Sequence, residues 1–310
     1  CLVGSEMCIR DRSVPFRNVS PVKSRLTVRE LLRFSMPVFA SSMYGFVIGS
    51  ASQFFVSRYL GVEDFALFAN GYRELPLAGM IIGAAAGVLL PEFSRMSGEG
   101  ADGGQFVRLW QAAVLKSSAI IYPLSVFCCV FAPEIICLLY GEGYREAAGL
   151  FRIVTVVNLA RIMPYAPVLF ALGRGKAFAR AHLVTALLIV GLDLLCVMAF
   201  PSLWAIAAIA TGCTLFCLFL LMMTTARVLG TSLAGLMPWR MLTTVLLVSA
   251  AACTAARLAV LLTGMTHRLA VVSVGFAVYL SLYLPFAQRA GIRYMELFGP
   301  VLAKLRPNRT

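Results

Sequence analysis

The chain has 310 residues, of which 60% are hydrophobic and 13% charged, and its formal net charge is +13. So much apolar surface exceeds what a single soluble core can hide, so the composition excludes an ordinary soluble domain and indicates a membrane protein. The basic residues are scattered between hydrophobic segments instead of clustering on one face, which argues against nucleic acid as a partner.

The two ends of the chain are expected to lie outside the membrane. Residues 1–12, CLVGSEMCIRDR, begin without Met and match neither a signal peptide nor an anchor, so we expect a non-native leader on a fragment that lacks its natural N-terminal portion. Residues 13–31 are expected to form a cytoplasmic segment, and residues 289–310 a basic cytoplasmic tail.

Between these ends, long apolar segments follow one another with short, Gly- and Pro-containing connections. A helix needs about 20 apolar residues to cross a bilayer, and an open strand cannot cross because its backbone groups would stay unpaired. We therefore predict an all-α, polytopic transmembrane bundle of about eight spans, with a six-helix lobe over 32–228 and two additional helices over 238–288. The predicted spans are 32–59, 65–94, 106–131, 147–172, 177–200, 203–228, 238–263 and 269–288.

The distribution of Lys and Arg predicts the orientation of these spans. Alternate loops and the two ends carry nineteen basic residues on one side of the membrane and three on the other. The positive-inside rule places the richer side in the cytoplasm. Both ends of this chain are therefore expected to be cytoplasmic, and the loops at 61–64 and 140–146 are expected to face outward.

Arg161 is the basic residue that lies deepest in a predicted span. It lies about 14 residues into its helix, or roughly 21 Å along the axis, past the middle of a hydrocarbon core about 30 Å thick. An Arg at mid-bilayer costs about 2.5–3.5 kcal/mol, so we expect a partner or a watery cavity. Thr155, Asn158, Arg161 and Tyr165 share an arc of about 120°, a polar stripe that is predicted to line that cavity.

Pro164 and Pro167 follow Arg161 directly. Each removes a backbone donor, so the helix is predicted to kink beside Arg161.

The second and fifth spans contain further polar residues. Asn70, Arg73 and Glu74 fall within one turn of the second span, where Asn70 can face either neighbour while Arg73 and Glu74 diverge. Asp193, in the middle of the fifth span, is the other acidic residue at depth. It could pair with one of the arginines or titrate as a coupling group.

Several of these charges have structural explanations. Arg152 and Lys116 are long enough to reach a membrane surface from within their spans, and Arg257 is expected to anchor its helix near the outer boundary. Arg161 and Arg73 lie too deep in their predicted spans to reach a membrane surface easily. Because guanidinium groups pair bidentately with phosphate oxygens, an anionic headgroup such as a pyrophosphate is the expected ligand. The candidate substrate-binding residues are Arg161, Arg73, Arg152, Asn158, Tyr165 and Asn70, and the candidate coupling or ion-pair residues are Glu74 and Asp193.

Two further patterns are assigned to packing. Gly79, Gly83 and Gly87 repeat every four residues and give one smooth helix face, suited to close helix packing or to a surface that slides during alternating access. The cysteines lie in apolar runs without a histidine at ligand spacing, so they are interpreted as small hydrophobic residues. No metal and no cofactor is expected.

Three stretches together resemble a known family. They are GVEDFALFANGYRELPLAGMIIGAAAGVLLPEFSRM, APEIICLLYGEGYREAAGLFRI and RIMPYAPVLFALGRGKAFARA. Their order and spacing resemble the C-terminal lobe of oligosaccharide flippases in the multidrug/oligosaccharidyl-lipid/polysaccharide exporter superfamily, over roughly residues 27–230. The second stretch is more similar to the O-antigen and exopolysaccharide branch, whereas part of the first is also similar to lipid II flippases.

This resemblance implies a fold of two six-helix lobes around a central cavity, with this chain as the second lobe plus two helices. The expected partners are a lipid-linked oligosaccharide, membrane lipids and the missing N-terminal lobe of the same protein. The implied activity is transport of undecaprenyl-pyrophosphate-linked oligosaccharide across the bacterial inner membrane. The family's pyrophosphate-binding role is carried onto Arg161 and Arg73, with Arg152 third.

Other functions remain open at this point: a lipid II flippase, a drug/cation antiporter of the same superfamily, or a membrane-embedded glycosyltransferase or polymerase. An antiporter prefers a carboxylate-lined cavity, for which only Glu74 and Asp193 are available. An enzyme of the last kind needs acidic or His residues on a large extramembrane loop. His182 and His267 lie near membrane ends and are interpreted as interfacial, so no catalytic residue is assigned.

Overall fold

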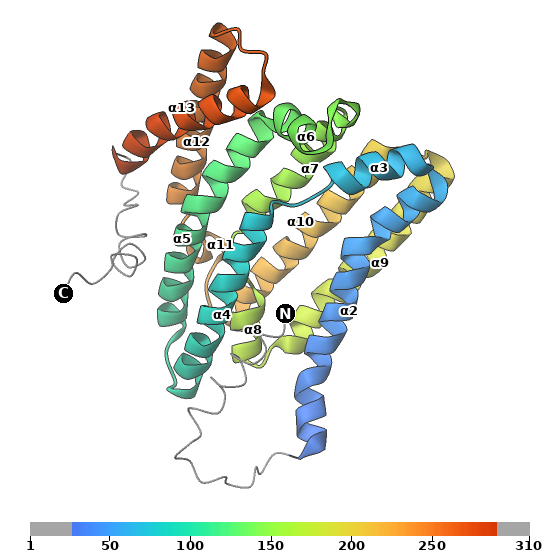
Figure 1. Ribbon diagram of the computed structural model, residues 1–310. Coiled ribbons are helices and arrows are strands. Elements are labelled where there is room, and N and C mark those ends of the chain that lie inside the picture. Colours follow the sequence, from blue (N-terminus) through green and yellow to red (C-terminus); the bar gives the residue numbers. More distant parts are fainter. Residues whose placement is uncertain (1–26, 290–310) are drawn as a thin grey trace, which may run out of the picture. The chain divides into compact units, whose positions relative to one another are not determined.

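The computed structural model describes residues 27–289 (Figure 1). The chain divides into two units, residues 1–36 and 37–310. The described part of the first unit is the start of helix α2 (Val28–Tyr59), where Thr27 and Glu30 exchange backbone-to-side-chain hydrogen bonds as a capping box. The predicted leader, most of the segment 13–31 and nearly all of the basic tail lie outside the described residues.

The described part of the chain is helical and contains no strand, so the predicted all-α class is confirmed. The second unit continues α2 and adds, in chain order, α3 (Val62–Gly71), α4 (Pro76–Gly98), α5 (Gly103–Val130), α6 (Ala132–Tyr140), η1 (Glu142–Tyr144), α7 (Ala147–Ala160), α8 (Ala166–Ala171), α9 (Gly175–Ala199), α10 (Leu203–Val228), α11 (Leu233–Leu236), α12 (Trp239–Leu262) and α13 (Arg268–Arg289). Over residues 27–289, seven of these helices are long and apolar enough to cross a membrane: α2, α4, α5, α9, α10, α12 and α13.

The predicted spans 65–94 and 147–172 are not continuous helices, and this part of the prediction was wrong. The first is divided into α3 and α4, and the second into α7 and α8. Leu75 adopts an extended conformation directly before Pro76, the first residue of α4, because proline disfavours the helical conformation in the residue that precedes it. Pro164 follows the end of α7 and supplies no amide hydrogen for a helical bond to Ala160. The predicted kink beside Arg161 is a complete interruption.

The loops alternate between two ends of the second unit. Figure 1 shows the α2–α3, α6–α7 and α12–α13 connections at one end, and the α4–α5 and α8–α9 connections at the other. The loops expected to face outward, at 61–64 and 140–146, therefore lie at the same end, which is the alternation that the count of basic residues assumes.

Packing between helices distant in sequence holds the second unit together. One hydrophobic core includes Trp110, Phe93 and Phe131, and a second joins Phe68 to Ile206. Exposed apolar side chains, including Met80, Leu187 and Leu247, cover the outside of the helices, as expected for surfaces that meet lipid. The seven cysteines in the described residues are free thiols: Cys128, Cys129, Cys137, Cys196, Cys213, Cys217 and Cys253.

Polar contacts fasten the last two long helices to the preceding bundle. Arg257 of α12 forms an ion pair of 2.7 Å with Glu134 of α6 and lies over the ring of Phe131 at 5.2 Å from its centroid. The hydroxyl of Tyr279 in α13 donates to the carbonyl of Pro123 in α5 at 3.1 Å. Arg257, expected to be an interfacial anchor, is therefore a link between helices.

The close packing predicted for the glycine stripe is not formed within the described residues, and its role as a sliding surface stays a prediction. A Cβ atom added at Gly79, Gly83 or Gly87 would meet nothing within 4 Å in the described part of the chain, so no described helix packs closely there. One close approach occurs instead at Gly71, the last residue of α3. A Cβ at Gly71 would lie 2.6 Å from the carbonyl oxygen of Ala147 at the start of α7.

We predict that Gly71→Ala lowers the stability of the protein in detergent by about 1–3 kcal/mol, because the added methyl group collides with a backbone atom that cannot rotate away. Gly79→Ala is the matched control and is expected to be neutral or slightly stabilising, since its methyl group enters open space and alanine favours helix. Thermal unfolding of the two purified variants measures the difference. Equal unfolding temperatures would contradict the assigned α3–α7 contact.

Candidate anion-binding cavity

The interruptions of the two divided helices meet each other. Arg161, directly after α7, and Glu74, between α3 and α4, form an ion pair with 2.7 Å between guanidinium nitrogen and carboxylate oxygen. Their side chains are 35% and 39% exposed. Arg161 caps the C-terminal end of α7, where its backbone N–H donates to the carbonyl of Val157, and a positive charge at that end of a helix is favourable.

A cavity of about 470 Å³ opens beside this ion pair. It lies among α2, the α3–α4 interruption, the end of α7 and the middle of α10. Arg73 also lines it and donates from Nε to the carbonyl of Ala69, in the last turn of α3, at 3.1 Å. The lining residues are Gly45, Ile48, Gly49, Ser52, Gln53, Phe68, Ala69, Tyr72, Arg73, Glu74, Val154, Arg161, Ala210 and Thr214.

The charged residues of this lining leave a positive excess. Arg73 and Arg161 contribute two guanidinium groups and Glu74 contributes one carboxylate. Glu74 pairs with Arg161, whereas Arg73 forms no ion pair within residues 27–289. The cavity can therefore accept an anion, which guanidinium groups bind through charge-assisted hydrogen bonds.

Asp193 lies next to the cavity but does not line it. Its side chain is fully buried, and one carboxylate oxygen accepts a hydrogen bond of 2.6 Å from the hydroxyl of Ser52, which does line the cavity. The other oxygen has no hydrogen-bond partner among the described residues. Of the two roles considered for Asp193, pairing with an arginine is not formed among the described residues, and the role of a coupling group stays a prediction.

The predicted polar stripe on residues 155–165 does not line one cavity. The side chain of Thr155 donates to the carbonyl of Phe151 within its own helix, and Asn158 is buried with its amide nitrogen unpartnered among the described residues. Tyr165 packs against Trp110 and lines a separate, mainly apolar cavity of about 370 Å³. The prediction assumed an unbroken helix. Since α7 ends at Ala160, the helical angle no longer fixes the direction of the later side chains.

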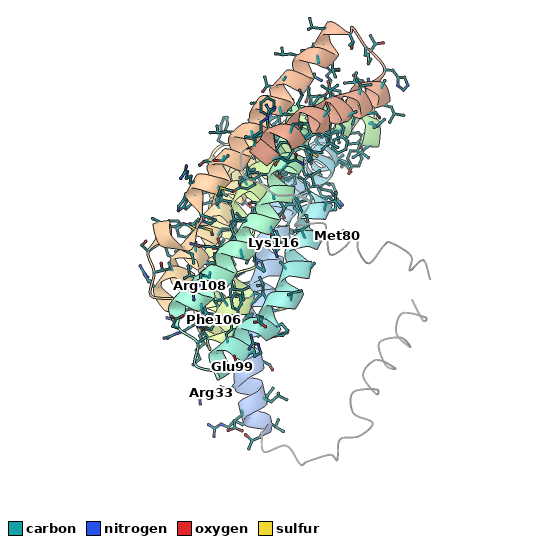
Figure 2. All side chains as sticks on the ribbon, turned by 90° about the vertical axis from the view of Figure 1, so that its left-hand side faces the viewer. Arg33, Met80, Glu99, Phe106, Arg108 and Lys116 are labelled. Carbon is teal, nitrogen blue, oxygen red and sulfur yellow. The ribbon has the colours of Figure 1, made fainter. Side chains whose placement is uncertain are left out.

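Two other predicted residues also lie away from the cavity. Arg152 is exposed and donates from Nε to the carbonyl of Cys129 at 3.1 Å. Asn70 donates to the carbonyl of Ala66 in its own helix at 2.9 Å. Lys116, which was given a structural explanation, is exposed on α5, farther along that helix than Arg108 (Figure 2).

Most of the neutral residues in the lining were not predicted from the sequence. Gly45, Gly49 and Ser52 come from one face of α2, and their spacing of three to four residues is a signal that could have been used. Tyr72 is held in place by a hydrogen bond of 2.9 Å between its hydroxyl and that of Thr211 in α10. No sequence signal pairs these two residues, which meet only after α3 packs against α10.

Residues 11–149 match a protein family described as polysaccharide biosynthesis protein, Polysacc_synt_3. The matched segment includes Arg73 and Glu74 and ends before Arg161. Comparison with curated proteins and with solved structures gives no match. Together with the seven long apolar helices, the family match supports a multi-pass membrane protein of the polysaccharide flippase type, and the resemblance predicted from the sequence is confirmed.

We predict that Ser52→Ala destabilises the protein by about 1–3 kcal/mol, because it removes the hydrogen bond to a carboxylate that is fully buried. Ser57→Ala is the control on the same helix. The Ser57 hydroxyl is bonded only to the carbonyl of Phe54 and is exposed, so its loss is expected to change stability by less than about 0.5 kcal/mol. Thermal or denaturant unfolding in detergent compares the stability of the two variants. Similar unfolding curves would show that the hydrogen bond from Ser52 to Asp193 does not stabilise the protein.

Proposed function

We propose that this chain acts in a flippase that moves undecaprenyl-pyrophosphate-linked oligosaccharide from the cytoplasmic to the periplasmic leaflet of a bacterial inner membrane. The observation that carries the proposal is the cavity at two helix interruptions, with Arg73 and Arg161 in its wall. In this proposal both ends of the chain are cytoplasmic, as the distribution of basic residues favours.

The position of the two arginines along their helices supports a site within the membrane. α3 has 10 residues and α7 has 14, and both start at loops of the end predicted to face outward. In Figure 1, α7 runs along the bundle; at about 1.5 Å per residue it extends roughly 21 Å, past the middle of a hydrocarbon core about 30 Å thick, and the ion pair places Glu74 beside its end. Non-helical backbone at this depth is tolerated where it is buried in protein or lines a water-filled cavity.

The chemistry of the lining favours a phosphate-bearing ligand. A guanidinium group presents several donors in a planar fork that matches phosphate oxygens. Arg73 has no carboxylate partner among the described residues, while Arg161 is held by Glu74 at 2.7 Å. A bound pyrophosphate competes with Glu74 for Arg161, which lowers the net affinity. A transporter benefits from such competition, because the substrate must leave on the far side.

A drug/cation antiporter fits the cavity less well. An organic cation would require an unpaired carboxylate in the lining, but Glu74 is neutralised by Arg161 and Asp193 is buried behind Ser52. A lipid II flippase would use the same pyrophosphate chemistry, so the arginines do not separate it from an oligosaccharide flippase.

We predict that Arg161→Ala reduces surface polysaccharide at least about tenfold in a strain whose polysaccharide depends on this protein, because a charge-assisted pair with the ligand is lost. Arg161→Lys retains the positive charge but not the planar fork of donors. Its surface polysaccharide is expected to lie between the amounts in the wild type and in Arg161→Ala. Arg145→Ala is the control, since Arg145 is exposed at the surface and pairs with Glu142 outside the cavity. Polysaccharide is measured by gel and protein level by immunoblot.

Normal polysaccharide in the Arg161→Ala strain, at an unchanged protein level, would reject the assignment. Loss of cell-wall synthesis in place of the polysaccharide would identify lipid II as the substrate. Transfer of sugar to a lipid-linked acceptor by the purified protein would show an enzyme of the glycosyltransferase or polymerase class.

A further inference from the structure

A second charged cavity lies at one end of the bundle. It has a volume of about 560 Å³ and is formed by the first turns of α9 and the last turns of α10. Its lining residues are Arg174, Ala177, Arg180, Ala181, Val184, Leu220, Thr224, Arg227 and Val228, none of which lines the cavity at Arg161. In Figure 1 this region lies at the end that carries the α8–α9 connection, which is predicted to face the cytoplasm.

Three exposed arginines without carboxylate partners among the described residues line this cavity. Arg174, Arg180 and Arg227 form no ion pair and no side-chain hydrogen bond within residues 27–289. Three positive charges around one space repel each other and together attract an anion.

A structural arginine in the same protein has different surroundings. Arg95 at the end of α4 lies between two carboxylates, with its guanidinium 2.6 Å from Glu92 and 2.7 Å from Glu99. An arginine that stabilises a helix end in this chain is therefore paired with carboxylates. Within residues 27–289, no carboxylate pairs with the three arginines on α9 and α10.

The remainder of the lining is apolar. Ala177, Ala181 and Val184 come from α9, and Leu220 and Val228 from α10, so the arginines stand beside an apolar wall on two helices that are long enough to span a membrane. A free phosphate ion or an acidic peptide would gain no binding energy from apolar contact with such a wall. A phospholipid fits both parts, with its phosphate at the arginines and its acyl chains along the helices.

We propose that this cavity binds the phosphate of an anionic phospholipid from the adjoining leaflet, with Arg174, Arg180 and Arg227 as the headgroup ligands. The site is distinct from the cavity at Arg161 and does not depend on the function proposed above. It requires only that α9 and α10 lie in a membrane, and it gives the lipid a fixed position on the two helices that pack against each other there.

The test measures lipid binding to the full chain. The protein is purified in detergent and titrated with phosphatidylglycerol, and bound lipid is counted by native mass spectrometry. We expect Arg180→Gln/Arg227→Gln to weaken binding at least about tenfold, since each arginine near a lipid surface contributes about a factor of five. Arg108→Gln/Arg240→Gln is the matched control, because both arginines are exposed on the same predicted side and neither lines the cavity. This control is expected to change affinity less than about twofold.

A second variant tests the cavity without changing the charge. Val184→Trp fills the space beside the arginines and is expected to weaken binding of phosphatidylglycerol as the double variant does. Thermal unfolding confirms that each variant is folded.

Three results would overturn the proposal. Equal losses in the double variant and its control would show general surface charge. Equal binding of phosphatidylcholine would show that the arginines do not select an anionic lipid. Tight binding of inorganic pyrophosphate in the absence of lipid, abolished by the same double variant, would show a site for free phosphate.

Discussion

The ion pair between Glu74 and Arg161 joins the two places where the helical backbone of this protein is interrupted. An interruption at membrane depth leaves carbonyl and amide groups without helical partners, which is tolerated only where protein or a watery cavity surrounds them. Here each interruption provides part of the enclosure for the other. The packing of α4 against α8 and of α3 against α7 holds the two together, and the cavity with Arg73 and Arg161 in its wall depends on that arrangement.

Most of the helices could be predicted from the sequence because lipid imposes a simple rule: an apolar run of sufficient length forms a helix. The interruptions were harder to predict, since the presence of proline alone does not determine where a helix is interrupted. Pro91 and Pro123 lie inside α4 and α5, whereas Pro76 and Pro164 lie at interruptions. The difference is in the neighbouring residues. Charged residues stand beside the two interruptions, at Arg73–Glu74 and at Arg161. An interrupted helix leaves room for a polar cavity, in which these charged side chains can be solvated.

The candidate site could be predicted in part. Arg73, Glu74 and Arg161 were singled out individually because charges at depth are costly, and the structure brings the three to one cavity. Their pairing was not predictable, because Glu74 and Arg161 are 87 residues apart and only the packing of α4 and α8 decides that they meet. Asn158 and Tyr165 were misplaced for the opposite reason. A helical projection was applied beyond Ala160, where the helix ends.

The arginines of this chain fall into groups that differ in what surrounds the guanidinium group. Arg95 and Arg145 pair with carboxylates close in sequence and fix local structure, whereas Arg257 pairs with Glu134 and links α12 to α6. An exposed arginine outside both cavities, such as Arg108, is hydrated, and the absence of a partner there carries no information. Unpaired arginines are informative where several of them line one cavity, because their positive charges together attract an anion. Both cavities discussed above hold such arginines: Arg73 stands beside Arg161 in one, and the exposed Arg174, Arg180 and Arg227 line the other. One lies where the divided helices are interrupted and the other lies where α9 begins and α10 ends, so the two proposals assign them different anions: a headgroup in transit and a lipid that stays in its leaflet.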